Sequence, residues 1–222
     1  MSLSLTLIII IASVGLSLLA FQNGDLKYKL MMNPFTVVHQ KQWYKTITHG
    51  FIHADFMHLF FNMYVLFGFG SIVEMNFSQP QLWKQNFPGI EGFSETNGLF
   101  FFGVLYFFGI IFASLPSIRK HKDNPNYYSL GASGAVSAVL IVYILMFPLN
   151  KLSIIFLPGI PIPAFVMGLL FFAFESYMNK KGNSGIAHDA HLYGALWGLI
   201  VIAVLKPALY SNFVNQILAS FN

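Results

Sequence analysis

The stretch Gly131-Ala132-Ser133-Gly134-Ala135 opens an apolar run that continues from Val136 to Pro148. With its opening, this run is long enough to cross a bilayer. A serine between small residues at the start of a membrane helix has two explanations. The small residues allow close packing of helices, or the serine is a nucleophile that a nearby base activates. The rest of the chain must distinguish these explanations.

The composition indicates a membrane protein. Of 222 residues, 56% are hydrophobic and only 9% are charged, whereas a soluble domain carries roughly a quarter charged residues. The chain has no cysteine, which excludes disulfides and thiolate metal ligands. Its net charge of +4 comes almost entirely from lysine, because Arg119 is the only arginine. We therefore expect lipid as a partner, and no nucleic acid.

Six apolar segments have about the length that a transmembrane helix needs. We expect an all-α, polytopic membrane protein in which residues 1–222 form a single membrane domain. The first segment has no basic stretch before it and no convincing cleavage site after it, so we interpret it as an uncleaved helix. The segments are Leu3–Phe21, Phe56–Val73, Leu99–Leu115, Ala132–Pro148, about Pro161–Met178, and His188–Leu205.

The connections between these segments differ in character. Asn23–Asp55 mixes aromatic residues with lysines and is expected to lie in the membrane interface. Glu74–Gly98 is polar and is predicted to be a water-facing loop. We predict that Leu152–Leu157 is interfacial and that the fifth helix begins near Pro163, since proline is tolerated in a first turn. The tail Pro207–Asn222 is predicted to form a short surface helix.

Polar side chains near the starts of three segments can converge. His58 and Asn62 share one helix face, where they either join neighbouring helices or donate hydrogen bonds to an oxyanion. The neutral imidazole of His191 can take a proton from the Ser133 hydroxyl. In a six-span chain, the second, fourth and sixth helices all start on the same side of the membrane. These four residues should therefore lie at similar depth.

We predict a Ser-His dyad without a third member. Asp189 is two residues from His191 and points to another side of the helix. Asp55 and Glu175 lie near the ends of spans and are interpreted as solvated. His188 lies on nearly the same face as His191, where it either assists the histidine or only packs.

Together these residues resemble the rhomboid family of intramembrane serine proteases. The pieces occur in the family's order, on or just before the second span, on the fourth and on the sixth, so the resemblance covers nearly the whole chain. The matching residues are His53, His58, Asn62, Gly131-Ala132-Ser133-Gly134, Ala190-His191, Gly194 and Gly198.

The resemblance implies a six-helix rhomboid-like bundle with a water-filled cavity and a serine endopeptidase activity that needs no cofactor or metal. It implies Ser133 as the nucleophile and His191 as the general base. His58, Asn62 and the Ser133 backbone N–H would bind the oxyanion, and His53 would support the first connection. The substrates would be membrane proteins cleaved in or near their transmembrane segments. We expect a multi-pass protein of a bacterial inner membrane.

The chain departs from the family's pattern at two places. Many members carry a Trp-Arg pair where this chain has Tyr44-Lys45, and lysine lacks the guanidinium fork. Many members also have an aromatic residue where this chain has Ser137, four residues after the nucleophile. We therefore hypothesise that another side chain, Tyr193 or His188, helps to hold His191.

Two other functions compete with proteolysis. A catalytically inactive rhomboid-like binding protein would normally lack the serine or the histidine, and both are present. A metal-binding membrane protein could use His49, His53, His58, His188 and His191, but the sequence contains no H-E-x-x-H pattern, no cysteine and few acids inside the spans. The orientation also stays open. Nine of the twelve basic residues lie in the first, third and fifth connections, which the positive-inside rule places in the cytoplasm and the resemblance places outside.

Overall fold

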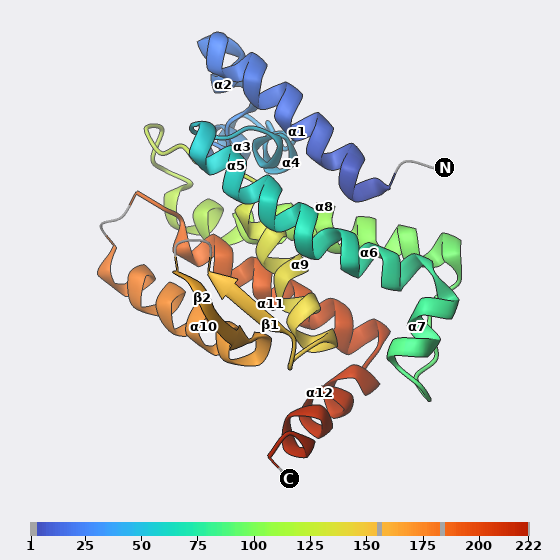
Figure 1. Cartoon of the computed structure of the whole chain (residues 1–222). Coiled ribbons are helices and arrows are strands. Elements are labelled where there is room, and N and C mark those ends of the chain that lie inside the picture. Colours follow the sequence, from blue (N-terminus) through green and yellow to red (C-terminus); the bar gives the residue numbers. More distant parts are fainter. Residues whose placement is uncertain (1–3, 155–156, 183–184, 222) are drawn as a thin grey trace.

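The computed structural model describes residues 4–154, 157–182 and 185–221 and is mostly helical. The predicted segments include Leu3, Ile155, Phe156 and Asn222, which lie outside the described residues. In Figure 1, α9 lies near the centre of the molecule, between α6, α8 and α11. The helices are α1 (Leu5–Gln22), α2 (Gly24–Leu30), α3 (Pro34–His39), α4 (Lys45–Thr48), η1 (His49–Phe51), α5 (Phe56–Val65), η2 (Leu66–Gly70), α6 (Ser71–Ser78), α7 (Pro80–Asn86), α8 (Glu95–His121), α9 (Ser133–Met146), α10 (Ala164–Lys181), α11 (His188–Leu205) and α12 (Ala208–Ala219).

Within the described ranges, four helices are long and apolar enough to cross a membrane. They are α1, the continuous helix 56–78 formed by α5, η2 and α6, then α8 and α11. The prediction of six membrane-spanning helices is thus not confirmed. Helix α9 has only 14 residues. Helix α10 has 18 residues, but these include the charged side chains of Glu175, Lys180 and Lys181.

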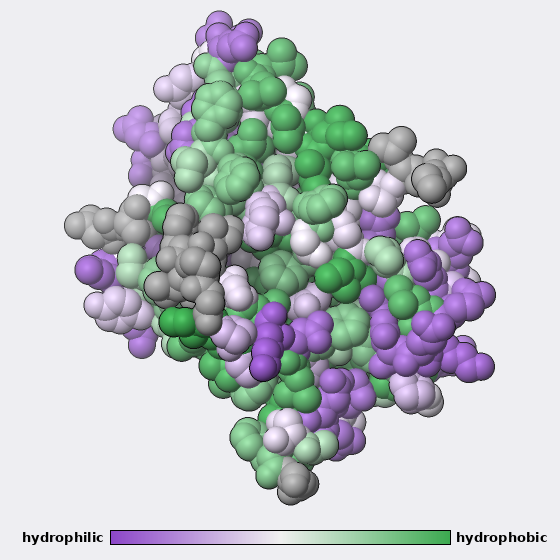
Figure 2. Space-filling model, in the orientation of Figure 1, coloured by the Kyte–Doolittle hydropathy of each residue, from purple (hydrophilic) through white to green (hydrophobic). Residues whose placement is uncertain are grey.

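Helix α9 forms the centre of the core. Twelve of its 14 residues are buried, as expected for a helix that is apolar on every side. It packs against α8, α11 and the π-helical segment η2. The outward faces of α1 and α5 carry exposed apolar side chains such as Ile8, Ile11 and Phe60. Figure 2 shows a mostly hydrophobic surface over α1 and α5, with hydrophilic residues gathered around α7, which suits a protein surrounded by lipid.

The fold is not all-α, because two strands precede α10. β1 (Lys151–Ile154) and β2 (Leu157–Pro163) pair antiparallel, with Lys151 opposite Pro163. The stretch Pro158-Gly159-Ile160-Pro161 cannot continue a helix, since each proline lacks the backbone donor. Helix α10 begins at Ala164 directly after Pro163, so the predicted start of this helix is confirmed.

The prediction of a water-facing loop over Glu74–Gly98 is wrong. Helix α7 lies within this connection, and the side chains of Trp83, Phe87 and Phe93 are buried in the core. The Trp83 indole N–H donates a hydrogen bond to the Ile90 carbonyl at 2.9 Å. The polar residues of this connection therefore surround a cluster of aromatic side chains that fixes it to the bundle.

The first connection folds as three short helices and the turn η1. Its aromatic side chains Tyr28, Trp43 and Tyr44 are exposed, as expected for a segment in the interface. Lys45 is buried and its ammonium donates to the Tyr28 carbonyl at 3.4 Å. This hydrogen bond therefore joins α4 to α2 within the first connection.

Helix α1 is capped by a carboxylate from a distant part of the chain. The Glu74 oxygens accept hydrogen bonds from the backbone N–H groups of Leu5 at 2.6 Å and Thr6 at 2.7 Å. Glu74→Gln removes the charge and one acceptor, so we expect the free energy of unfolding to fall by about 1–2 kcal/mol. Thermal unfolding in detergent measures this. Glu95→Gln, which changes an exposed carboxylate, should leave the midpoint unchanged, and equal midpoints for both variants would contradict the capping role.

Candidate active site

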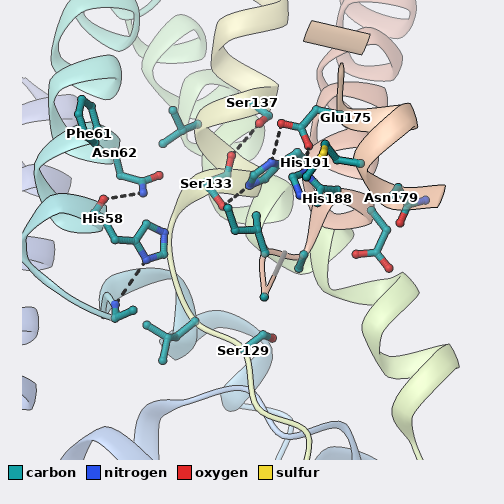
Figure 3. Close-up of a pocket in the computed structure, with 18 of the residues that line it drawn as sticks. His58, Phe61, Asn62, Ser129, Ser133, Ser137, Glu175, Asn179, His188 and His191 are labelled. Atoms are coloured by element: carbon teal, nitrogen blue, oxygen red, sulfur yellow. Dashed lines mark hydrogen bonds and ion pairs between the residues drawn. The ribbon is translucent and has the colours of Figure 1, made fainter. Parts of the chain in front are cut away.

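Helix α5 places His58 and Asn62 on one side of a cavity (Figure 3). The helix is capped by Asp55, whose side chain accepts a hydrogen bond from the His58 backbone N–H at 2.8 Å. The His58 Nδ1 atom accepts from the Ala54 N–H at 3.4 Å, which leaves the ring proton on Nε2. The Asn62 side-chain amide donates one N–H to the His58 carbonyl at 2.8 Å. The His58 ring thus offers its Nε2–H, and the Asn62 amide offers its second N–H.

The backbone that leads into Ser133 is held by the first connection. Gly131 donates its N–H to the His49 carbonyl at 2.9 Å, and Ala132 donates to the His53 Nε2 atom at 3.4 Å. Gly131 has a φ of +120°, and a Cβ there would lie 2.6 Å from the His58 ring. Only glycine fits both the backbone conformation and the space.

The small residues bring α9 and α11 into direct contact, as predicted. A Cβ at Gly194 would collide with the Gly134 carbonyl oxygen, and a Cβ at Gly198 would lie 2.5 Å from the Ala138 carbonyl oxygen. This close approach places the Ser133 Oγ atom 2.7 Å from the His191 Nε2 atom.

A buried carboxylate lies behind His191. The Glu175 Oε1 atom is 3.0 Å from the His191 Nδ1 atom, and its Oε2 atom is 2.6 Å from the His188 Nδ1 atom. Glu175 is 6% exposed and His188 is 4% exposed. The interpretation of Glu175 as solvated is therefore wrong, and the predicted dyad omits a group that contacts the histidine.

The sequence contained a signal for this carboxylate. Glu175 is the only acidic residue between Asp123 and Asp189, and it lies inside a segment predicted to span the membrane. An ionisable residue in such a segment indicates a functional site. Proximity to the end of the span led instead to the prediction of a solvated side chain.

Other polar residues near the site have separate contacts. Asp189 accepts from the Ala190 N–H at 2.9 Å. Tyr193 is exposed and its ring faces Phe112, with the ring centres 6.4 Å apart. Of the two proposed supports for His191, His188 is therefore the one that shares a partner with it.

The four predicted site residues line one cavity of about 900 Å³. In Figure 3, Ser133 lies between His58 and Asn62 on α5 and the group of His191, His188 and Glu175. The cavity is lined by His58, Asn62, Ser133 and His191, together with Glu175 and His188.

His53 lies outside this lining, as the resemblance implied. Its Nδ1 atom is 3.0 Å from the Ser17 Oγ atom, and its Nε2 atom accepts from Ala132. The five-histidine metal site is not formed in the described part of the chain. The three potential ligands that gather there are Glu175, His188 and His191.

A family model described as the rhomboid domain matches residues 40–208, which is more than half of the chain. The chain belongs to the rhomboid family. The matched range contains all of the residues that line the cavity at Ser133 and His191.

Curated rhomboid relatives occur in plants and mammals. RHOMBOID-like protein 12, mitochondrial, of Arabidopsis thaliana is 29% identical over 80% of this chain and 52% of its own length. Presenilin-associated rhomboid-like protein, mitochondrial, of Homo sapiens is 28% identical over 73% of this chain and 38% of its own. Rhomboid-like protein 11, chloroplastic, of Arabidopsis thaliana is 26% identical over 74% and 53%. The chain thus spans about half or less of each relative.

The apolar helices and the relatives bear on where this rhomboid is located. Its long apolar helices make it an integral membrane protein. The names of the relatives place them in mitochondria or chloroplasts, so they do not support the expected bacterial inner membrane.

Two buried histidines below the site should make this rhomboid sensitive to acid. Burial lowers the pKa of His49 to about 4, and burial, followed by the nearby His58 ring, lowers the pKa of His53 to about 3. Unfolding returns both rings to an ordinary pKa of about 6.5. As the pH falls below about 6.5, the unfolded chain binds protons that the folded chain does not. Each ring then lowers the free energy of unfolding, by about 2 kcal/mol at pH 5.

Thermal unfolding between pH 7.5 and pH 5 measures this effect. We expect a constant midpoint above neutral pH and a falling midpoint below it. His49→Gln should flatten the acid side of the curve, while His39→Gln, at an exposed histidine, should leave it as steep as in the wild type. An acid side that is equally steep in the His49 variant would contradict this assignment.

Proposed function

We propose that this rhomboid is an intramembrane serine endopeptidase. The observation that carries the proposal is the distance of 2.7 Å between Ser133 Oγ and His191 Nε2, in a cavity that His58 and Asn62 also line. The proposal includes a single membrane domain over residues 1–222 and a bundle of six membrane helices, in which α9 and α10 are the two outside the long apolar set.

In the first step, Ser133 attacks the carbonyl carbon of a substrate peptide bond. The hydroxyl proton moves to His191 Nε2 while the new C–O bond forms, which leaves a negative charge on the carbonyl oxygen. The His58 Nε2–H, the second N–H of Asn62 and the backbone N–H of Ser133 are the donors for this oxyanion. Ser133 is the first residue of α9, whose start has no side-chain cap, so its N–H is open to such a ligand.

The second half of the reaction regenerates the serine. The C–N bond breaks, and the leaving nitrogen takes the proton from His191 to depart as an amine. Water then attacks the acyl-serine ester and gives a proton to His191. The ester C–O bond breaks, the proton returns to Ser133, and the other product is a carboxylic acid.

The position of the site indicates the class of substrate. Ser133 and His191 lie at the starts of two core helices of a membrane protein. A transmembrane helix has its carbonyl groups occupied by internal hydrogen bonds, so it must unwind locally before a peptide bond reaches Ser133. We propose membrane proteins as substrates, cleaved in or near their transmembrane segments, with no cofactor.

Labelling with a fluorophosphonate probe tests the proposal. The purified wild-type protein in detergent should react covalently with the probe, and chelators should not change the labelling. A protein that folds but does not label would favour the inactive binding protein. The metal alternative has one observation in its favour, the cluster of Glu175, His188 and His191. Activity that EDTA removes and Zn²⁺ restores would support that alternative.

A further inference from the structure

We infer that Glu175 is a positioning residue for His191, and that His188 in turn holds Glu175. The inference rests on the proposed protease function. It replaces the predicted dyad with three side chains in line, contributed by three helices: Ser133 from α9, His191 from α11 and Glu175 from α10. His188, one turn before His191 on α11, binds the other carboxylate oxygen.

The carboxylate determines which nitrogen of His191 carries the proton. An ionised carboxylate only accepts hydrogen bonds, so the Nδ1 atom at 3.0 Å from Oε1 must be the protonated nitrogen. In the neutral ring the Nε2 atom then has the free lone pair, and this atom faces the Ser133 hydroxyl at 2.7 Å. With the opposite tautomer, Nε2 would be a donor and could not take the serine proton.

His188 explains how the carboxylate can be buried there. A buried carboxylate is unfavourable unless both oxygens have partners. Here each oxygen faces a different imidazole: Oε1 faces His191 and Oε2 faces His188. The His188 ring also lies edge-on to the His191 ring, with 6.0 Å between the centres. His188 therefore fixes the carboxylate, and the carboxylate fixes His191.

This arrangement shows how His191 is held although Ser137 stands where many rhomboids have an aromatic residue. The Ser137 hydroxyl donates to the Ser133 carbonyl at 2.8 Å, so it stays on its own helix and offers no ring to His191. The histidine is held from its Nδ1 side instead, by a group on α10. During attack the imidazole becomes positively charged, and the Glu175 carboxylate stabilises that charge without taking the proton itself.

Four variants separate positioning from mere packing. Glu175→Met keeps the size of the side chain and removes both oxygens, and we expect kcat to fall by roughly 10²–10⁴-fold with KM nearly unchanged. Glu175→Gln keeps one oxygen acceptor without the charge and should give an intermediate loss. Glu175→Asp keeps the carboxylate, and its kcat should be more than tenfold higher than that of Glu175→Met. Glu95→Gln is the control, because its carboxylate is exposed at the start of α8.

A second readout does not depend on activity. In protein labelled with ¹⁵N-histidine, the ring nitrogen shifts report which nitrogen of His191 carries the proton. We expect Nδ1–H in the wild type and in Glu175→Asp, and a shift toward Nε2–H in Glu175→Met. His191→Gln identifies the His191 signals by their disappearance.

The outcomes distinguish this inference from the proposed function. Wild-type kcat and an unchanged His191 tautomer in Glu175→Met would overturn the positioning role while the protease stands. Absence of fluorophosphonate labelling in the wild type would overturn the proposed protease function. The ¹⁵N shifts of His191 would then decide by themselves whether Glu175 positions this ring. If Glu175→Met unfolds, Glu175→Gln decides, and wild-type kcat with an unchanged tautomer in that variant would overturn the inference.

Discussion

Replacing Ser133 by alanine is expected to abolish proteolysis and fluorophosphonate labelling while the fold stays intact. In the proposed mechanism the Ser133 hydroxyl oxygen forms the acyl bond, and loss of a serine nucleophile lowers kcat by up to roughly 10⁶-fold. Alanine differs from serine only by lacking the hydroxyl, so it adds no atom that could collide with a neighbouring helix. The measurement is cleavage of a panel of single-span proteins by the purified rhomboid in lipid vesicles.

A matched serine elsewhere in the bundle supplies the control. Ser114 is buried in α8, and its hydroxyl donates to the Ile111 carbonyl of the same helix at 2.6 Å. Ser114→Ala should cleave the same substrates at the wild-type rate. If Ser133→Ala cleaves them as fast as Ser114→Ala does, Ser133 is not the nucleophile, and the alternative functions take its place.

Gly194→Val should have the second largest effect, on stability and activity together. Any Cβ at this position collides with the backbone carbonyl of Gly134, and neither backbone can rotate away inside a helix. The helices must therefore separate, which costs roughly 1–3 kcal/mol or more. Separation also moves Ser133 away from His191, and a displacement of about 1 Å can lower the rate 10²-fold. Thermal unfolding and probe labelling measure the two effects.

A glycine with free space around it shows whether the effect is specific. Gly15 lies in α1, and a Cβ there meets no atom within 4 Å. Gly15→Val should retain nearly the wild-type midpoint and full labelling. Equal behaviour of the two variants would mean that α9 and α11 do not approach each other as closely as the structure shows.

The contact between Ser133 and His191 could be predicted because its signals are local. Ser133 stands among small residues at the start of an apolar run, and His191 stands at the start of another. Helix starts on the same side of a membrane lie at similar depth, so the pairing followed from the order of the segments. The structure places these two side chains in hydrogen-bonding distance.

The position of Glu175 in a predicted span indicated a functional site, but its partners could not be predicted because they belong to another segment. Glu175 belongs to α10, whereas both of its partners belong to α11. The same reason applies to the connection after α6. Its polar residues are visible in the sequence, but the burial of Trp83 and Phe87 depends on contacts with distant helices.

The β-hairpin was missed for a different reason. The prolines of the stretch before Ala164 correctly excluded a helix and gave the start of α10. They did not predict pairing, because the partner strand Lys151–Ile154 is only four residues long, and alternation of polar and apolar side chains over so few residues is a weak signal.

The backbone that enters α9 has a consequence for how the protein meets lipid. Ser129 pairs with Met32, Gly131 with His49 and Ala132 with His53, so this irregular stretch needs neither water nor lipid to satisfy these groups. The position of Ser133 is therefore fixed by its contacts with the first connection and does not depend on the surrounding lipid. Bilayers of different thickness change how far a substrate's own helix extends past that fixed level. If the proposed protease activity holds, we expect bilayer thickness to influence which peptide bond of a substrate reaches Ser133.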